Sequence, residues 1–502
     1  MVKEEKSGVS RRKFLGLTAA AAGAVVADRL LLPEGLYAVR TPAKWDQETD
    51  VLVIGTGYAG LSAALEAFDA GSQVILIEKQ PIVGGNSIIA NGNYNAVDPE
   101  RQKKQGIEDS TDLFYQQAMA YGDNLADPEK LRFMVDNALP GLQWLEKMGV
   151  QFNPTVGGMP GLTPRAHAPV KNGRGAAIVA VLKSQVEKRK IPIMLEYKLT
   201  GVVREKPHAG AIQGVEVEHR GKKFYFKARK ATILTTGGFG ADVMLRSKYV
   251  HRMDADIPTI DQPGATGEAI VAAEQEGAAV VYMKFIETAL CNYKTKKPGS
   301  LVNSGKDSAV FVNLGGKRFV AEDAKPALLT DAIIRQPQKL MLWVADDRCA
   351  KAGNEAVTAG LLKENLCFKA DKLEELAKVL QNEFGVPPEK FLATLKRYNE
   401  AVAKGEDKLG KAKASLKPVE KAPFFASPVV PGTSHTLGGL RTIGNTAQVL
   451  NRSGNPIPRL YAAGECSGGT HGNARIGGNG TAAAVVFGRL SGQKAAGEKP
   501  WA

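Results

Sequence analysis

Uninterrupted apolar runs and helical apolar spacing alternate in the first part of the chain. The run "DVLVIG" (50–55) is continuous and rich in β-branched residues, as is typical of a buried parallel strand. "LSAALEAFDAG" (61–71) has apolar residues at helical spacing, and "QVILIE" (73–78) is a second apolar run, which ends at Glu78. The pattern predicts a strand, a glycine turn, a helix and a second strand over residues 49–79.

Two later segments again combine an apolar strand with glycines, namely "KATILTTGGFG" (230–240) and "RLYAAGECSGG" (459–469). Between them, 285–436 is richer in lysine and in helical patterns such as "DKLEELAKVLQNEF" (371–384) and "PEKFLATLKRYNEAV" (388–402). We therefore expect an α/β fold with a discontinuous Rossmann-like FAD-binding domain and an inserted α+β capping domain. The expected divisions are a signal and linker (1–45), the first part of the FAD-binding domain (46–284), the capping domain (285–436) and the second part of the FAD-binding domain (437–502).

The first glycine turn has the chemistry of a dinucleotide site. Gly55, Gly57 and Gly60 form G-x-G-x-x-G between a strand and a helix, and Glu78 closes the next strand about twenty residues later. The glycines would let a pyrophosphate reach the helix N-terminus, and Glu78 would hold ribose hydroxyls. An NAD-dependent dehydrogenase would carry the same motif. The two further strand-to-glycine elements favour the longer FAD.

Composition, charge and the N-terminal segment limit the compartments and the partners that we expect. The 502 residues are 44% hydrophobic and 24% charged, with a formal net charge of +14. The lysines are scattered and no aromatic-basic pattern accompanies them, so we expect no nucleic-acid binding and favour docking of an acidic redox protein. "SRRKFLGLTAAAAGAVVA" (10–27) is typical of a twin-arginine export signal, with a basic amphipathic helix as the alternative. We expect a periplasmic or otherwise extracytoplasmic protein without a membrane span.

The four cysteines show no C-x-x-C spacing, which excludes covalent haem in this chain, and no metal site is expected.

The chain resembles the soluble fumarate reductase/flavocytochrome c flavoprotein family, which includes urocanate and methacrylate reductases and, more remotely, ketosteroid dehydrogenases. The resemblance is carried by "GTGYAGLSAA", "EKQPIVGGNS", "TTGGFG", "ATGEAI", "VNLGGKRFVAE", "SHTLGGL", "LYAAGE" and "GGTHGNARIGGNG". It implies hydride transfer from flavin N5 to an activated C=C bond. No histidine follows the second strand in "GGNSIIANGNYNA", so the FAD should be non-covalent, and electrons should come from a separate c-type cytochrome.

The resemblance also implies site residues. His435 and Arg475 would clamp a substrate carboxylate. The expected cofactor-binding residues are Gly55, Gly57, Tyr58, Ala59, Gly60, Glu78, Lys79, Gly85, Asn86, Ser87, Asn91, Gly92, Asn93, Thr236, Gly237, Glu268, Gly464, Glu465, Asn479, Gly480 and Thr481.

The remaining active-site positions of the family do not match. Ala289 stands where fumarate reductases have a histidine, and Pro326 stands where they have the proton-donating arginine. Lys325 is then the nearest replacement acid. The rivals for this role are Tyr282, Tyr293 and Asp323, and Arg165 and His167 would either approach the flavin or be structural.

Three functions remain open at this point. The first is an exported reductase for an activated alkene that carries a carboxylate and is not fumarate. The second is the reverse chemistry, a ketosteroid dehydrogenase-like desaturase with a tyrosine or lysine base. The third is a flavin electron-transfer subunit without a small substrate of its own.

Overall fold

Three strands that end in glycine-rich turns lie side by side in a parallel sheet, in the order β17 (Pro456–Ala462), β8 (Lys222–Leu234) and β1 (Gln47–Ile54). The computed structural model describes residues 39, 41–159, 161–170, 173–297, 308–352 and 355–501, so the expected export signal lies outside the described residues. β2 (Val74–Ile77) and β5 (Ile193–Met194) continue the sheet in parallel beyond β1. β16 (Gln448–Leu450) is antiparallel to β17, and β6 (Lys198–Lys206) and β7 (Ala209–His219) form a hairpin on β8.

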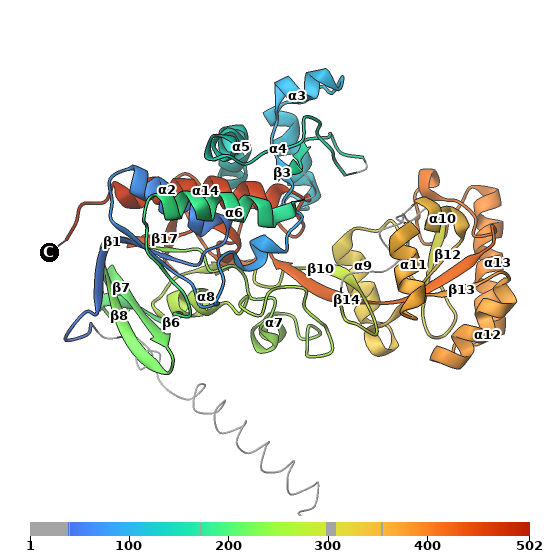
Figure 1. Ribbon diagram of the computed structural model, residues 1–502. Coiled ribbons are helices and arrows are strands. Elements are labelled where there is room, and N and C mark those ends of the chain that lie inside the picture. The colour runs from blue at the N-terminus through green and yellow to red at the C-terminus, as the bar shows by residue number, and fades with distance from the viewer. Residues whose placement is uncertain are drawn as a thin grey trace, which may run out of the picture.

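Both faces of this sheet are covered, which explains the continuous apolar run in β1. Val51 and Val53 pack on one side with α2 (Tyr58–Asp69), α6 (Arg174–Lys188) and α14 (Asn479–Ala496), which are stacked above the sheet in Figure 1. Leu52 and Ile54 point to the other side, into a cluster with α8 (Glu268–Gln275) and the β6–β7 hairpin. Successive side chains of a strand alternate between faces, so a strand buried on both sides needs apolar residues at every position.

A second sheet is formed by strands that lie between residues 286 and 436. Its order is β10 (Ile286–Asn292), β14 (Phe424–Thr436), β12 (Met341–Ala345) and β11 (Ala309–Val312), with β13 (Phe368–Ala370) also on β14. The two amphipathic segments predicted to be helical form α12 (Leu373–Phe384) and α13 (Pro388–Lys404), which bury Leu376, Leu380, Phe391 and Leu395 against one face of it. The mixed α/β class with its parallel sheet is confirmed, whereas the divisions at 285 and 436 stay predictions.

The remaining elements connect and cover these sheets. They are β3 (Tyr94–Asn95), β4 (Ala166–His167), β9 (Val280–Val281), β15 (Gly439–Leu440), α3 (Pro99–Lys104), α4 (Thr111–Tyr121), α5 (Pro128–Met148), α7 (Val243–Tyr249), α9 (Pro326–Ile334), α10 (Asp347–Ala352), α11 (Glu355–Lys363) and the 3-10 helices η2 (Gly85–Ile88), η5 (Pro337–Lys339), η6 (Lys413–Ser415) and η7 (Gly464–Cys466).

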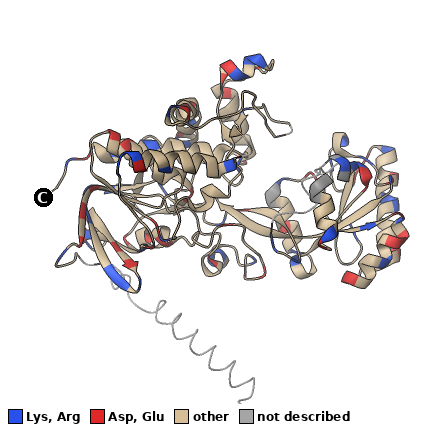
Figure 2. Ribbon diagram, in the orientation of Figure 1, with Lys and Arg blue, Asp and Glu red and all other residues tan. Residues whose placement is uncertain are grey.

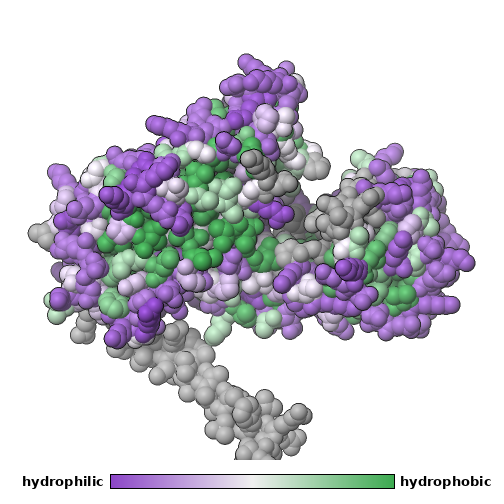
Figure 3. Space-filling view, in the orientation of Figure 1, coloured by the Kyte–Doolittle hydropathy of each residue, from purple (hydrophilic) through white to green (hydrophobic). Residues whose placement is uncertain are grey.

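The two sheets belong to two lobes, and β10 and β14 run from one lobe to the other (Figure 1). The surface is hollowed between the lobes in the view of Figure 3. Figure 2 shows Lys and Arg interspersed with Asp and Glu over both lobes, which agrees with the scattered basic residues of the sequence. Within the described part of the chain, no helix is long and apolar enough to cross a membrane.

Candidate active site

A cavity of about 390 Å³ lies at the carboxyl ends of β1, β8 and β17. This edge of a parallel sheet is where such folds bind their ligands. All the expected cofactor-binding residues except Gly60 and Asn479 line it, and so do His435 and Arg475. The strands therefore bring together glycine turns that are hundreds of residues apart in sequence.

The first glycine turn is built for close backbone approach. Gly55 has φ of 106°, a left-handed conformation that favours glycine, and a Cβ on it would lie 2.4 Å from the Thr235 carbonyl oxygen. Gly60 faces away from the cavity: its Cβ would lie 1.9 Å from the Gly55 carbonyl oxygen. Its role is therefore to let α2 pack on the turn, and not to contact a cofactor.

The N-terminus of α2 opens toward the cavity. The N-cap residue Gly57 has no side chain to cap this helix, and the N–H of Tyr58 donates instead to Ser87 Oγ at 3.0 Å. Glu78, at the end of the next strand, accepts from the N–H and the hydroxyl of Thr56 at 3.1 and 2.6 Å. The neighbouring Lys79 is bound to Glu268 at 2.6 Å, so these two expected cofactor ligands also bind each other.

The opposite end of the cavity is lined by His435 and Arg475, and an unexpected carboxylate, Glu287, binds Arg475 without being among the lining residues. Glu287 Oε2 accepts from Arg475 Nη2 at 2.9 Å, and its Oε1 accepts from the backbone N–H of Arg475 at 2.8 Å. Glu287 on β10 is also the direct antiparallel partner of His435 on β14. Arg475 Nε is buried and has no hydrogen-bond partner among the described residues.

Burial sets the protonation states at this end. It lowers the pKa of His435 well below its ordinary value, and the positive charge of Arg475 lowers it further. Burial raises the pKa of Glu465 to about 8, with the negative charge of Asp261 adding to the shift. Glu465 Oε2 lies 3.4 Å from His435 Nδ1, and its Oε1 accepts from the Thr436 N–H at 2.8 Å. At neutral pH the pair is therefore a neutral imidazole beside a largely protonated carboxyl.

Sequence patterns missed several residues of this site. Asp261 lines the cavity and binds Asn86 at 2.8 Å, and Glu287 binds Arg475 across 188 positions of sequence. Lys130 is buried and donates to Ser467 Oγ at 2.6 Å and to the Gly468 carbonyl oxygen at 2.7 Å, which fixes the start of the last glycine-rich segment. The G-x-G-x-x-G pattern is local, whereas none of these contacts has a sequence signal.

Asn479 is a cofactor candidate that the structure places elsewhere. It is buried, and its Oδ1 accepts from Asn95 Nδ2 at 2.7 Å. This contact joins the start of α14 to β3, so Asn479 stabilises the wall of the cavity without lining it.

Lys325 is not among the described residues that line the cavity. Its side chain is half exposed and forms an ion pair with Asp123 of the first lobe. The rivals Tyr282, Tyr293 and Asp323 are not lining residues either, and Asp323 accepts from the N–H of Ala412 at 2.8 Å. The acid role of Lys325 stays a prediction.

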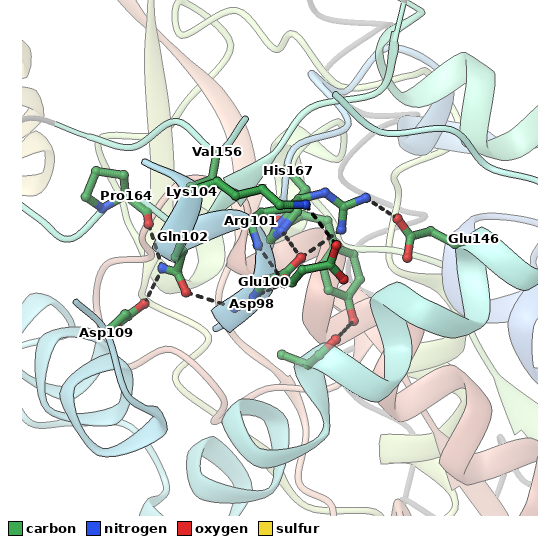
Figure 4. A network of polar contacts seen from close by, with 12 residues as sticks. Asp98, Glu100, Arg101, Gln102, Lys104, Asp109, Glu146, Val156, Pro164 and His167 are labelled. Atoms are coloured by element: carbon green, nitrogen blue, oxygen red, sulfur yellow. Dashed lines mark hydrogen bonds and ion pairs between the residues drawn. The ribbon is translucent and has the colours of Figure 1, made fainter. Parts of the chain in front are cut away.

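Arg165 and His167 are not among the residues that line the cavity. His167 belongs to the polar network of Figure 4, together with Asp98 and Asp109. Arg165 is buried and bound to Asp109 at 2.6 and 2.9 Å. The ring nitrogens of His167 lie 3.1 Å from the Tyr94 carbonyl oxygen and 3.2 Å from Asp98, which also binds Arg101. The sequence left two roles open for Arg165 and His167, contact with the flavin or a structural role. These contacts are of the structural kind.

The cavity walls fit FAD. Gly237 and Gly85 line the cavity in left-handed conformations, and a Cβ on either would meet no atom within 4 Å. Thr236 Oγ1 is buried at the same wall without a hydrogen-bond partner among the described residues. The glycine backbone at these walls, the N-terminus of α2 and this hydroxyl would hold the diphosphate and the polar chain of the cofactor.

A family model described as "FAD binding domain" matches residues 50–481. The chain is 34% identical over 452 residues to a fumarate reductase (cytochrome) of Shewanella frigidimarina, which covers 89% of this chain and 77% of that protein. The chain belongs to this family of fumarate reductase-like FAD oxidoreductases. It binds FAD and acts on carbon–carbon double bonds or their reduced forms.

Other family members differ in length. The acrylate reductase flavoprotein subunit of Shewanella woodyi (strain ATCC 51908 / MS32) is 30% identical, over 94% of this chain and 95% of that protein. The NADH:fumarate oxidoreductase of Klebsiella pneumoniae (strain 342) is 35% identical over 89% of this chain, which spans 47% of that protein.

Two solved structures of related proteins have a similar fold. The open conformation of a flavocytochrome c3 fumarate reductase matches with a TM-score of 0.77 and 29% identity, over 98% of this chain and 82% of that one. A 3-ketosteroid-delta4-(5alpha)-dehydrogenase from Rhodococcus jostii RHA1 matches with a TM-score of 0.73 and 25% identity, over 91% and 99%.

Proposed function

We propose that this family member is an exported reductase that delivers a hydride to an activated C=C bond of a carboxylate-bearing substrate other than fumarate. The observation that supports it is the meeting of His435 and Arg475 at one end of a cavity whose other walls fit FAD. Ala289 and Pro326, at positions where fumarate reductases have a histidine and an arginine, argue against fumarate itself.

The side chains would orient the substrate and stabilise its developing charge. Arg475 keeps its charge when desolvated, and the N–H groups not used by Glu287 can bind a carboxylate oxygen. A protonated Glu465 facing Nδ1 of His435 favours the tautomer with a proton on Nε2, which can then donate to the substrate. Bound FAD supplies the hydride.

Electrons would come from a separate c-type cytochrome in the periplasm. The chain lacks C-x-x-C-H, so it carries no covalent haem of its own, while relatives such as the fumarate reductase of Shewanella frigidimarina are cytochrome-linked by name. The twin-arginine segment at 10–27 supports export, and the absence of a histidine at 84–96 supports non-covalent FAD.

Arg475→Lys tests the carboxylate clamp. Lysine keeps the charge but loses the fork, so we expect kcat/KM for an enoate to fall by about 10- to 100-fold, the equivalent of one charge-assisted hydrogen bond. The assay is anaerobic oxidation of reduced methyl viologen by acrylate and urocanate. Arg489→Lys is a matched control, because Arg489 binds Glu66 at 2.6 Å with similar exposure but is not among the residues lining the cavity. Equal losses in both variants would contradict the clamp.

A dehydrogenase is the second candidate, and one contact favours it. Glu287 already neutralises part of the charge on Arg475, as a site for an uncharged enone or ketone would require. A dehydrogenase is bleached anaerobically by its saturated substrate alone, whereas a reductase is bleached by reduced viologen and reoxidised by the alkene.

A further inference from the structure

Arg475 is bound to a carboxylate of its own chain. One oxygen of Glu287 binds the guanidinium at 2.9 Å and the other binds the backbone N–H of the same residue at 2.8 Å. The two side chains are only 20% and 16% exposed. Two bonds from one carboxylate to one residue fix the arginine more firmly than a single surface ion pair would.

The pair is also held from both sides. Glu287 is opposite His435 in the β10–β14 ladder, where directly opposed side chains emerge on the same face of the sheet. A Cβ on Gly480 would lie 3.1 Å from Arg475 Nη1, so the guanidinium lies against the backbone at the start of α14. Arg475 therefore lies between Glu287 and Gly480, and a substrate that binds Arg475 would be close to the charge of Glu287, although Glu287 itself is not among the residues lining the cavity.

Apart from Asp261, whose negative charge acts on Glu465, the charges at this end reduce to the Arg475–Glu287 ion pair. Burial, and then the charge of Arg475, lowers the pKa of both His435 and His471, so that both are neutral. Burial raises the pKa of Glu465, so that it is mostly protonated at neutral pH. The positive charge of Arg475 is then opposed by the negative charge of Glu287. A second carboxylate about 5 Å from Glu287 would be disfavoured on the order of 10²-fold at an effective dielectric constant of about 20.

We propose that Glu287 determines specificity by substrate charge: the site takes alkenes with one carboxylate and an uncharged or hydrogen-bond-donating far end, and excludes dicarboxylates. One carboxylate can share Arg475 with Glu287, whereas a second would be repelled by the charge of Glu287 without a cation of its own. The inference rests on the proposed reductase function, because it names the substrate class of the same site.

Glu287→Gln tests this with little change of shape. The variant keeps an acceptor oxygen for Arg475 and removes the negative charge. We expect kcat/KM for fumarate to rise at least 10-fold relative to kcat/KM for acrylate, with reduced viologen as the donor. Glu66→Gln is the matched control, since it removes the charge from an Arg–Glu pair of similar exposure whose arginine, unlike Arg475, does not line the cavity. Glu287→Ala should shift the ratio in the same direction if the glutamine variant folds poorly.

A binding experiment separates this inference from the proposed function. Succinate and propionate are titrated into the oxidised FAD-loaded protein, and the change in flavin absorbance gives each Kd. We expect wild type to bind propionate more tightly and Glu287→Gln to reduce the preference at least 10-fold. An unchanged ratio, equal wild-type affinities, or no binding of either acid to either protein would overturn charge selection. Failure of every alkene to reoxidise the flavin would instead overturn the reductase function, and the titration would still decide the role of Glu287.

Discussion

Gly60→Ala should weaken FAD binding about 100-fold, although Gly60 is not among the residues that line the cavity. The added Cβ would lie 1.9 Å from the Gly55 carbonyl oxygen and 2.7 Å from Thr235 Oγ1, whereas ordinary van der Waals contact begins near 3.4 Å. The turn and α2 would have to separate by about 1.5 Å.

The helix has no room for this movement. On its other side α14 is equally close, because Cβ atoms on Gly488 and Gly492 would lie 2.5 and 2.3 Å from backbone oxygens of α2. Overpacking of a core usually costs about 1–3 kcal/mol, and a wedged helix should lie at or above the upper end. If the turn conformation that binds FAD becomes about 3 kcal/mol less favourable, FAD should bind roughly 100-fold more weakly.

The assay is the ratio of flavin to protein after purification, followed by FAD titration of the apoprotein. Gly360→Ala is the control, because a Cβ there meets no atom within 4 Å and the residue is exposed in α11. Stoichiometric flavin in Gly60→Ala, with a melting temperature within about 2 °C of wild type, would refute the packing argument.

Three further predictions concern charge. The apoprotein should lose stability as pH rises from about 4.5 to about 8, because the folded state holds the Glu465 proton that the unfolded chain releases. The difference in Tm between Glu465→Gln and wild type should therefore grow from pH 6 to pH 9. A difference that stays constant over this range would contradict the prediction. If Lys325 is the acid, Lys325→Ala should lower kcat about 100-fold or more with flavin reduction by viologen unchanged, and equal turnover would remove it from the mechanism. Asp109→Asn should destabilise the protein by about 3–5 kcal/mol in urea titrations, because it leaves the buried Arg165 unpaired, while the flavin spectrum stays the same; a loss under 1 kcal/mol would show that the pair is dispensable.

Local patterns predicted the elements of the fold best where one physical constraint dominates. "DVLVIG" indicated a buried parallel strand, because both of its faces are covered. The strand β14 is different: Pro428 and Pro431 are not typical of an interior strand. Each is tolerated because it has a ladder partner on one side only, Leu342 of β12 for Pro428 and Leu290 of β10 for Pro431. Whether a proline is tolerated in β14 therefore depends on where the neighbouring strands end, and the sequence of β14 alone does not reveal this.

The candidate site likewise has a part that local sequence motifs predict and a part that they do not. Backbone turns such as Gly55 and Gly237 were predictable because their glycines stand in short motifs next to strands. Glu287 was not, because its meaning comes from contact with Arg475 across 188 positions. Lys325 is next to Pro326 in sequence, but it is not among the described residues that line the cavity, because neighbours in sequence need not point into the same site.

The central claim is that the FAD of this protein gives its electrons to an alkene. The most direct measurement is anaerobic: the purified flavoprotein is photoreduced, and acrylate, urocanate, fumarate and uncharged enones are added in turn while flavin absorbance is recorded. We expect rapid reoxidation by a monocarboxylate alkene and slow or no reoxidation by fumarate. Reoxidation by none of them, together with bleaching of the oxidised protein by a saturated analogue, would contradict the reductase and establish the reverse reaction.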